Sequence, residues 1–276
     1  MRSFFVSIIL LGSAAQAVAQ DAFNDLTGYF DLGLGYTQNS AYFNDIKVGS
    51  SDEWSGTATA VMQYRFDRCA VGMLASAKND AESVETNSYF APNYDIDRRI
   101  LTIAGQAGCE VHDFWIVAFG LLGTNSSESS IGGRWSTDRQ AWGGGIDYRF
   151  SPDLSLGLMV MRDDYDFSGG TLETTLYGAK VDYFFYENMM LSTRLNLRND
   201  DFDRTFEASS TLFYKPEDWR VALYGGVTGN FQSAKSSTLM PGDEAHTTSI
   251  GAVAGLRFFF DDHTLRAQHN NTMPVF

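Results

Sequence analysis

The sequence has little proline, little cysteine and no long apolar run outside its first residues. Its 276 residues include five prolines and two cysteines, which excludes a proline-rich linker between domains and a dense disulfide framework. Beyond residue 19, no apolar run approaches the roughly 20 residues that a membrane-spanning helix needs. If the chain crosses a membrane, we therefore expect it to do so with β-strands.

The apolar run at the amino terminus has the layout of a secretory signal. Arg2 precedes apolar residues 4–11, and small residues follow over 15–19. We expect cleavage after Ala17 or Ala19, so residues 1–19 are predicted to be a signal peptide outside the fold. No cysteine follows either cleavage position, which argues against a lipoprotein.

The chain is acidic and lacks the residue patterns of most catalytic and cofactor sites. Its formal net charge of -14 and isoelectric point of about 4.6 disfavour nucleic acid as a partner. Metal-ligand spacings, a glycine-rich phosphate loop and a nucleophile elbow are absent from the sequence. We therefore expect no metal, no cofactor and no catalytic residue, and we interpret acidic runs such as 80–82 and 163–166 as solvated loop tips.

A clear period of two runs through residues 141–161. Between 141 and 150 the large apolar side chains share one parity, and glycine or charged side chains share the other. Pro152 and Asp153 then favour a turn, and the alternation resumes at Leu154. This hairpin, with one apolar and one polar face, fits either a water-soluble sandwich or a transmembrane barrel.

The number and spacing of such segments favour the barrel. Short connections, such as 67–68 and 151–152, alternate with long polar ones such as 38–52, 79–97, 124–138 and 232–246. This asymmetry is typical of bacterial outer-membrane barrels, whereas a sandwich has no reason to show it. The twelve predicted strands lie near residues 27–37, 53–66, 69–78, 98–109, 114–123, 139–150, 153–163, 172–185, 188–198, 203–214, 218–231 and 247–260.

Aromatic residues mark the strand ends that lead into short turns. Pairs two residues apart occur at 64 and 66, 148 and 150, 183 and 185, and 258 and 260, as expected of an aromatic girdle at a membrane interface. Gly255 followed by Phe258 and Phe260 also resembles the terminal assembly signal of outer-membrane barrels.

The chain thus resembles the porin-like outer-membrane proteins of Gram-negative bacteria. The resemblance implies an all-β fold, a transmembrane antiparallel up-and-down β-barrel of 12 strands over residues 20–260, in the bacterial outer membrane. Because the family's signal normally ends the chain, residues 261–276 are predicted to be a periplasmic C-terminal tail, with Phe276 as the alternative signal. Outer-membrane lipid, lipopolysaccharide and the barrel assembly machinery are the expected partners, and homo-oligomer formation is left open.

The two cysteines are candidates for a disulfide. Cys69 opens the third predicted strand and Cys109 closes the fourth, both at the short-turn end. Their parities place both side chains on the lipid-facing side. Because the periplasm is oxidising, we predict a bond between them, and the alternative is two free thiols in the girdle.

Extending the alternation through each strand predicts which side chains face the lumen. Arg65, Arg149, Arg220 and Arg257 fall near the short-turn end and would form a basic collar at the periplasmic mouth. The lumen charges either line an open or gated path or pair with one another and plug the barrel. The predicted pore-lining residues are Asp31, Arg65, Asp147, Arg149, Lys180, Asp182, Arg194, Arg198, Glu207, Arg220 and Arg257.

Three functions fit these patterns. The favoured one is a channel for passive diffusion of small hydrophilic solutes or ions. The second is a structural or surface-interaction barrel with a plugged lumen. The third is an outer-membrane lipid hydrolase that uses His246 with Ser249 or Asp243, although the phospholipase arrangement of Gly-His-x-Ser-Asn is absent.

Overall fold

The computed structural model describes residues 26–87, 92–167, 169–200, 202–234, 243–260, 263–271 and 273–274. The predicted signal peptide, residues 1–19, lies outside the described residues. Among these residues, no helix is long and apolar enough to pass through a membrane.

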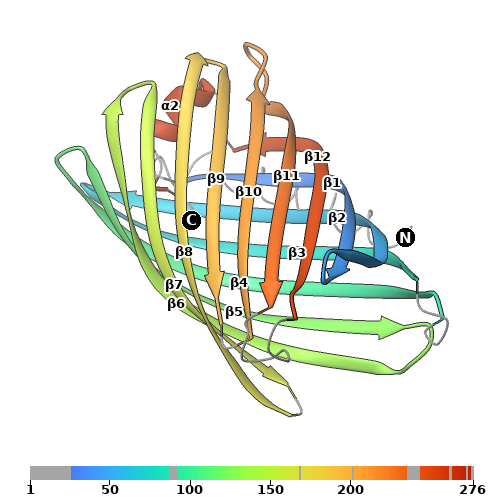
Figure 1. Cartoon of the computed structure of the whole chain (residues 1–276). Helices are drawn as coiled ribbons and strands as arrows, with labels where there is room; N and C mark the ends of the chain where they lie inside the picture. Colours follow the sequence, from blue (N-terminus) through green and yellow to red (C-terminus); the bar gives the residue numbers. More distant parts are fainter. Residues whose placement is uncertain are drawn as a thin grey trace.

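Twelve antiparallel strands form one closed barrel, in which each strand pairs with the next and β12 pairs with β1 (Figure 1). The predicted fold class and strand number are confirmed. The strands are β1 (Leu26–Phe43), β2 (Ile46–Phe66), β3 (Cys69–Thr86), β4 (Tyr94–Val111), β5 (Phe114–Ser129), β6 (Arg134–Ser151), β7 (Leu154–Phe167), β8 (Gly170–Tyr186), β9 (Met189–Asn199), β10 (Asp203–Tyr214), β11 (Val221–Ala234) and β12 (Ala245–Phe259), and the helix α2 (Leu265–Asn271) follows them.

The strands extend further than the sequence predicted at the end opposite the short turns. The expected long connection 38–52 is instead a continuation of β1 and β2, which meet at a two-residue turn. Asn44 and Asp45 both have positive φ there, at 47° and 62°, as hairpin turns require. The prediction failed because residues 38–52 lack a regular apolar alternation, although their backbone pairing continues.

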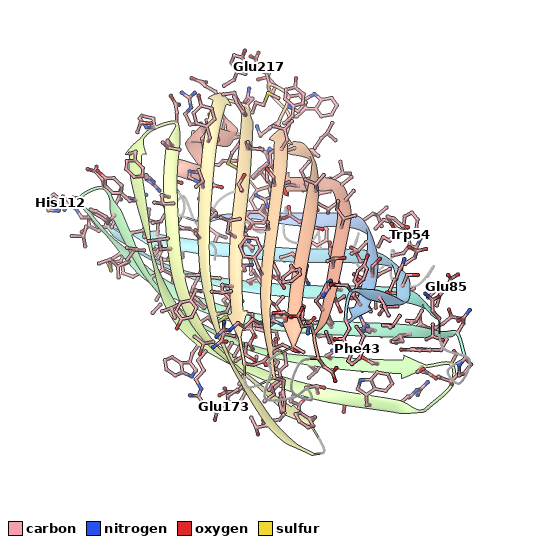
Figure 2. All side chains as sticks on the ribbon, viewed as in Figure 1. Phe43, Trp54, Glu85, His112, Glu173 and Glu217 are labelled. Carbon is pink, nitrogen blue, oxygen red and sulfur yellow. A yellow bond between two sulfur atoms is a disulfide. The ribbon has the colours of Figure 1, made fainter. Side chains whose placement is uncertain are left out.

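The outward and inward faces of the wall differ as predicted. Tyr64, Phe66, Phe150 and Phe185 are exposed on the outward face near the short turns, where an aromatic girdle would contact the membrane interface. His112 and Glu217 mark the rim formed by the short turns in Figure 2, and Phe43 and Glu173 lie toward the opposite rim.

A pair of glycines lies at the seam that closes the barrel. Gly33 of β1 is opposite Gly255 of β12, and the Tyr224 ring of β11 lies over both on the lumen side. A Cβ atom on Gly33 would lie 2.5 Å from the Tyr224 hydroxyl, and one on Gly255 would lie 2.4 Å from it. Larger residues at either position would therefore displace this ring.

Beyond β12 the chain folds back into the barrel. We call residues 263–274 the C-terminal segment; its helix α2 lies behind β8 and β9 in Figure 1, inside the wall. Leu265 packs with Phe184, Phe213 and Phe259 on the β8–β12 side. Met273 packs with Trp115 and its neighbours on β3 and β5. The segment therefore crosses the lumen near the short-turn end; which side of the membrane this end faces stays a prediction.

Candidate functional site in the barrel lumen

The seam between β1 and β12 carries an ion pair that faces the lumen. Arg257 donates two hydrogen bonds to the carboxylate of Asp31, at 2.7 Å each. Its guanidinium carbon also lies 3.9 Å from the centre of the Tyr29 ring and 4.7 Å from that of Phe213. Bidentate geometry and stacking fix Arg257 against the wall.

Two further predicted collar residues converge on one carboxylate. Arg65 lies 2.6 Å from an oxygen of Glu110, and Arg149 lies 3.8 Å from the other. Glu110 was not predicted as a lumen residue, because the sequence places it in the short connection 110–113, although its parity matches the inward residues of β4. The collar is therefore not a ring of unpaired positive charge.

The C-terminal segment contacts a third charged group on β8. Lys180 lies 3.0 Å from the Asp182 carboxylate, and Nε2 of His269 lies 2.9 Å from the same oxygen. Arg149 also donates to the His269 carbonyl, at 3.4 Å. No sequence pattern predicted these contacts, because His269 lies in a stretch without strand alternation.

The far end of the C-terminal segment is held by β2. The Gln63 amide donates to the Met273 carbonyl at 2.8 Å and accepts from the Met273 backbone nitrogen at 2.9 Å. At its other end, the Arg266 backbone nitrogen donates to the Glu187 carbonyl at 2.9 Å. Backbone and side-chain bonds thus secure both ends of the segment to opposite sides of the wall.

Asp147, a predicted pore-lining residue, is fully buried, with an exposed fraction of 0%. It lies opposite Trp115 of β5 in the strand register, beside the cluster that holds Met273. Neither of its carboxylate oxygens has a hydrogen-bond partner among the described residues. A buried, unbonded carboxylate is costly, so the wall beside the C-terminal segment stores unfavourable free energy.

The other predicted pore-lining residues have separate environments. Arg198 stacks at 6.0 Å from the Tyr165 ring, and Glu207 accepts a hydrogen bond of 3.4 Å from Asn196. Arg220 lies before β11, and its backbone carbonyl accepts from Phe259 at 2.7 Å. Arg194 faces inward from β9 and is exposed to the lumen.

Two charged clusters line the half of the lumen away from the short turns. The first joins β2, β3 and β4: Lys78 lies 2.8 Å from Asp80 and 3.3 Å from Glu53, and Arg98 pairs with Glu53 and Glu82. The interpretation of residues 80–82 as a solvated loop tip was therefore wrong. These residues lie on β3, with both acids buried by pairing with basic neighbours.

The second cluster joins β6 and β7. Arg139 donates two hydrogen bonds to Asp163, at 2.8 and 2.7 Å, and the Tyr165 hydroxyl donates to the same carboxylate at 2.9 Å. Asp163 is fully buried, so the run 163–166 is likewise part of a strand and not a loop tip. Most of these ion pairs join residues of the same or neighbouring strands, and Arg98 reaches from β4 over β3 to Glu53 on β2. The pairs of both clusters thus run along the wall, not across the lumen.

A cavity of about 110 Å³ remains between the wall and the C-terminal segment. It is lined by residues of β1, β2, β8, β9, β10 and β12 and by the segment itself. Its charged lining residues are Lys180, Asp182, Arg194 and Arg257. No cluster of potential metal ligands occurs among the described residues.

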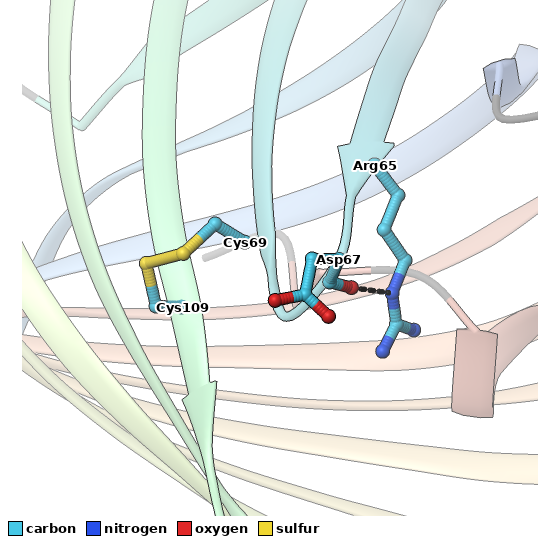
Figure 3. Close-up of a disulfide and its surroundings, with 4 residues drawn as sticks. All are labelled: Arg65, Asp67, Cys69 and Cys109. Atoms are coloured by element: carbon cyan, nitrogen blue, oxygen red, sulfur yellow. Dashed lines mark hydrogen bonds between the residues drawn. A yellow bond between two sulfur atoms is a disulfide. The ribbon is translucent and has the colours of Figure 1, made fainter.

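The two cysteines form a disulfide on the outer side of the short-turn rim (Figure 3). Cys69 of β3 and Cys109 of β4 are direct partners in the strand register. On the connection beside them, Arg65 donates a hydrogen bond of 3.2 Å to the Asp67 carbonyl. The bond joins two strands that are already paired, and it therefore reinforces the wall.

The proposed hydrolase residues are not assembled. His246 stacks on Tyr42, with ring centres 4.8 Å apart. Ser249 lies three residues further along β12, and strand alternation directs the two side chains to opposite faces. Asp243 accepts a hydrogen bond from Asn44 at 3.1 Å, so these three residues do not converge on one site.

No protein-family model matches the sequence, and no curated protein matches it either. Among solved structures, the transport unit of the autotransporter AIDA-I from Escherichia coli matches with a TM-score of 0.55 and 8% identity, over 87% of this chain and 92% of that one. The toluene transporter TodX from P. putida matches with a TM-score of 0.50 and 8% identity, over 88% and 91%. At this identity the likeness concerns the fold alone, and the chain has the closed β-barrel fold of these outer-membrane proteins.

Proposed function

We propose that the protein is an outer-membrane channel through which small hydrophilic solutes or ions diffuse passively. One observation carries this proposal: Arg194 faces inward, midway along β9, and is nevertheless exposed. Solvent therefore reaches the interior of the barrel. The wall charges support the proposal because the ion pairs of the two charged clusters run along the wall.

The C-terminal segment is, in this proposal, the element that narrows the path. Leu265 and Met273 are 3% and 1% exposed, and burying each contributes about 1.5–3 kcal/mol. The unbonded Asp147 beside the segment costs about 1–3 kcal/mol or more. Because the two burials together contribute only about 3–6 kcal/mol and Asp147 offsets part of this, we expect the segment to be displaceable rather than permanently fixed.

Single-channel recording in planar lipid bilayers tests both the channel and the role of the C-terminal segment as its constriction. The full chain is compared with a chain that ends at Phe260, and we expect the shortened chain to give conductance steps several times larger. Leu265→Asp combined with Met273→Asp provides a second, full-length variant, because charged side chains cannot remain in the two apolar clusters. It should behave as the shortened chain does.

The second candidate function is the plugged structural barrel, and the position of the C-terminal segment across the lumen favours it. The outcomes of the recordings distinguish this plugged barrel from the channel. If the shortened chain and the double variant both fold, as judged by β-sheet circular dichroism, and neither conducts, the channel proposal is wrong and the plugged structural barrel replaces it. Equal conductance in all three proteins would retain the channel and reject the C-terminal segment as its constriction.

We also propose that the protein is not an enzyme. The separation of His246 and Ser249 on opposite strand faces supports this, as does the absence of a converging nucleophile and base among these residues. Phospholipid hydrolysis by the purified protein that is lost in His246→Ala would overturn it.

A further inference from the structure

The cavity beneath the C-terminal segment contains more positive than negative charge. Lys180, Arg194 and Arg257 line it, and Asp182 is the acid among its described lining residues. Asp31 lies behind Arg257 and neutralises it through the bidentate pair at 2.7 Å. Asp182 is shared between Lys180 at 3.0 Å and His269 at 2.9 Å.

Arg194 accounts for the excess positive charge in the cavity. Within residues 26–274, so far as they are described, it forms no ion pair and no hydrogen bond with a carboxylate. Glu207 of β10, two residues beyond the register partner of Arg194, accepts a hydrogen bond from Asn196 instead. One full positive charge therefore faces the cavity.

The strand register also places two cations side by side. Lys180 of β8 and Arg194 of β9 are direct partners, and Cβ atoms of such partners lie about 4.5–5.5 Å apart. Like charges in this position destabilise a sheet. Asp182 offsets only part of this repulsion, and an anion between the two side chains would offset the rest.

We propose that this cavity binds a small carboxylate anion, held by the Arg194 guanidinium and the Lys180 ammonium group. Arginine matches a carboxylate with two parallel hydrogen bonds, and lysine adds a point charge. A cavity of about 150 Å³ takes up a benzene molecule, so the 110 Å³ here suits a ligand of about four to six non-hydrogen atoms. Propionate has this size and chemistry.

The anion site extends the proposed channel function. One consequence rests on that function: the channel should prefer small organic anions to cations. The excess charge lies inside the path, where it acts over short distances and in a reduced dielectric. At the other end of the lumen, the Arg139–Asp163 pair is neutral, whereas the cluster on β2, β3 and β4 has two cations and three carboxylates. Its one excess negative charge would act against this preference, so the anion site must outweigh it.

Binding is tested first, without any need for conductance. Carbon-13 propionate is titrated into the purified full-length protein in detergent and followed by NMR, with propionamide as the neutral analogue. We expect saturable propionate binding to the wild type, no competition from propionamide, and at least tenfold weaker binding to Arg194→Gln. Arg204→Gln is the matched control, because Arg204 is an exposed arginine on the neighbouring strand β10. Equal propionate affinity in Arg194→Gln and the wild type would overturn the site.

Selectivity is then read from the reversal potential in a gradient of potassium propionate. The preference for the anion should fall in Arg194→Gln and persist in Arg204→Gln. A protein that binds propionate through Arg194 but never conducts would reject the channel and retain the site. A conducting protein whose propionate binding and selectivity are both unchanged in Arg194→Gln would retain the channel and reject the site.

Discussion

The two halves of the lumen differ in what covers their inward side chains: ion pairs within the wall in one half, and an added segment of chain in the other. Away from the short turns, the wall pairs its own charges through ion pairs between neighbouring strands, such as Arg139 with Asp163 and Lys78 with Glu53. Near the short turns, added chain crosses the lumen and buries Leu265 and Met273 against opposite walls. A barrel wall can thus satisfy its own polar groups, whereas narrowing the lumen requires a separate segment.

This difference has an energetic consequence. The charged clusters are part of the strand ladder and cannot leave it without unfolding the wall. The C-terminal segment is tied by side chains and a few backbone bonds, so it can separate while the wall stays intact. The following variants test whether stability and access to the lumen are indeed controlled by different ends of the barrel.

The largest loss of stability is expected from Asp163→Asn. Asp163 is fully buried and pairs with Arg139 through two hydrogen bonds; removing its charge leaves Arg139 uncompensated. Breaking such a pair costs about 3 kcal/mol or more. Urea unfolding of the protein folded in lipid vesicles, followed by tryptophan fluorescence, measures the loss.

The matched control for Asp163→Asn is an exposed ion pair. Arg134 and Glu128 lie 2.8 Å apart, but their side chains are 79% and 56% exposed, and such pairs contribute at most about 1 kcal/mol. Arg134→Gln should therefore leave the unfolding transition nearly unchanged. If both variants lose the same stability, the wall clusters have no special role.

A smaller free-energy change, confined to the C-terminal segment, is expected from Leu265→Ala. Truncating this buried side chain should weaken docking by about 2 kcal/mol, which corresponds to a roughly thirtyfold larger undocked population. Arg266, the next residue, is a trypsin site whose backbone nitrogen is bonded to Glu187. Cleavage after Arg266, followed by mass spectrometry, should accelerate by about the same factor.

The control for Leu265→Ala is Leu256→Ala, because Leu256 is exposed on the outward face of β12. It should leave the rate of cleavage after Arg266 unchanged. Rapid cleavage of the wild type itself, at the rate seen in Leu265→Ala, would show that the segment is not docked in solution.

The smallest of the three effects is expected from replacing both cysteines with serine. The disulfide closes a separation of 40 residues, but it links strands that already pair over their whole length, so we expect a loss of about 1 kcal/mol in urea unfolding, at the low end of the range for disulfides. Because the bond lies on the outer side of the wall, cleavage after Arg266 should not change. Faster cleavage would mean that the wall and the C-terminal segment are coupled.

The local alternation of apolar and polar residues predicted the positions of many side chains in the candidate site. Parity placed Arg257, Lys180 and Arg194 on the inward face, and parity with short turns placed Cys69 opposite Cys109. The acidic runs were misplaced for a related reason: beyond the apolar band both strand faces are polar, so Asp80 and Glu82 look like loop residues in sequence. Only their pairing with Lys78 and Arg98 on the folded wall distinguishes them.

The sequence by itself determined the class of fold, the number of strands and the identity of most inward side chains, because the period of two is a property of each strand alone. The tertiary structure alone decided where the C-terminal segment lies. Its partners are remote: His269 meets Asp182 across 87 residues, and Met273 meets Gln63 across 210. Contacts over such separations form only when the barrel closes and brings opposite walls within reach of one short stretch of chain, so no local pattern can encode them.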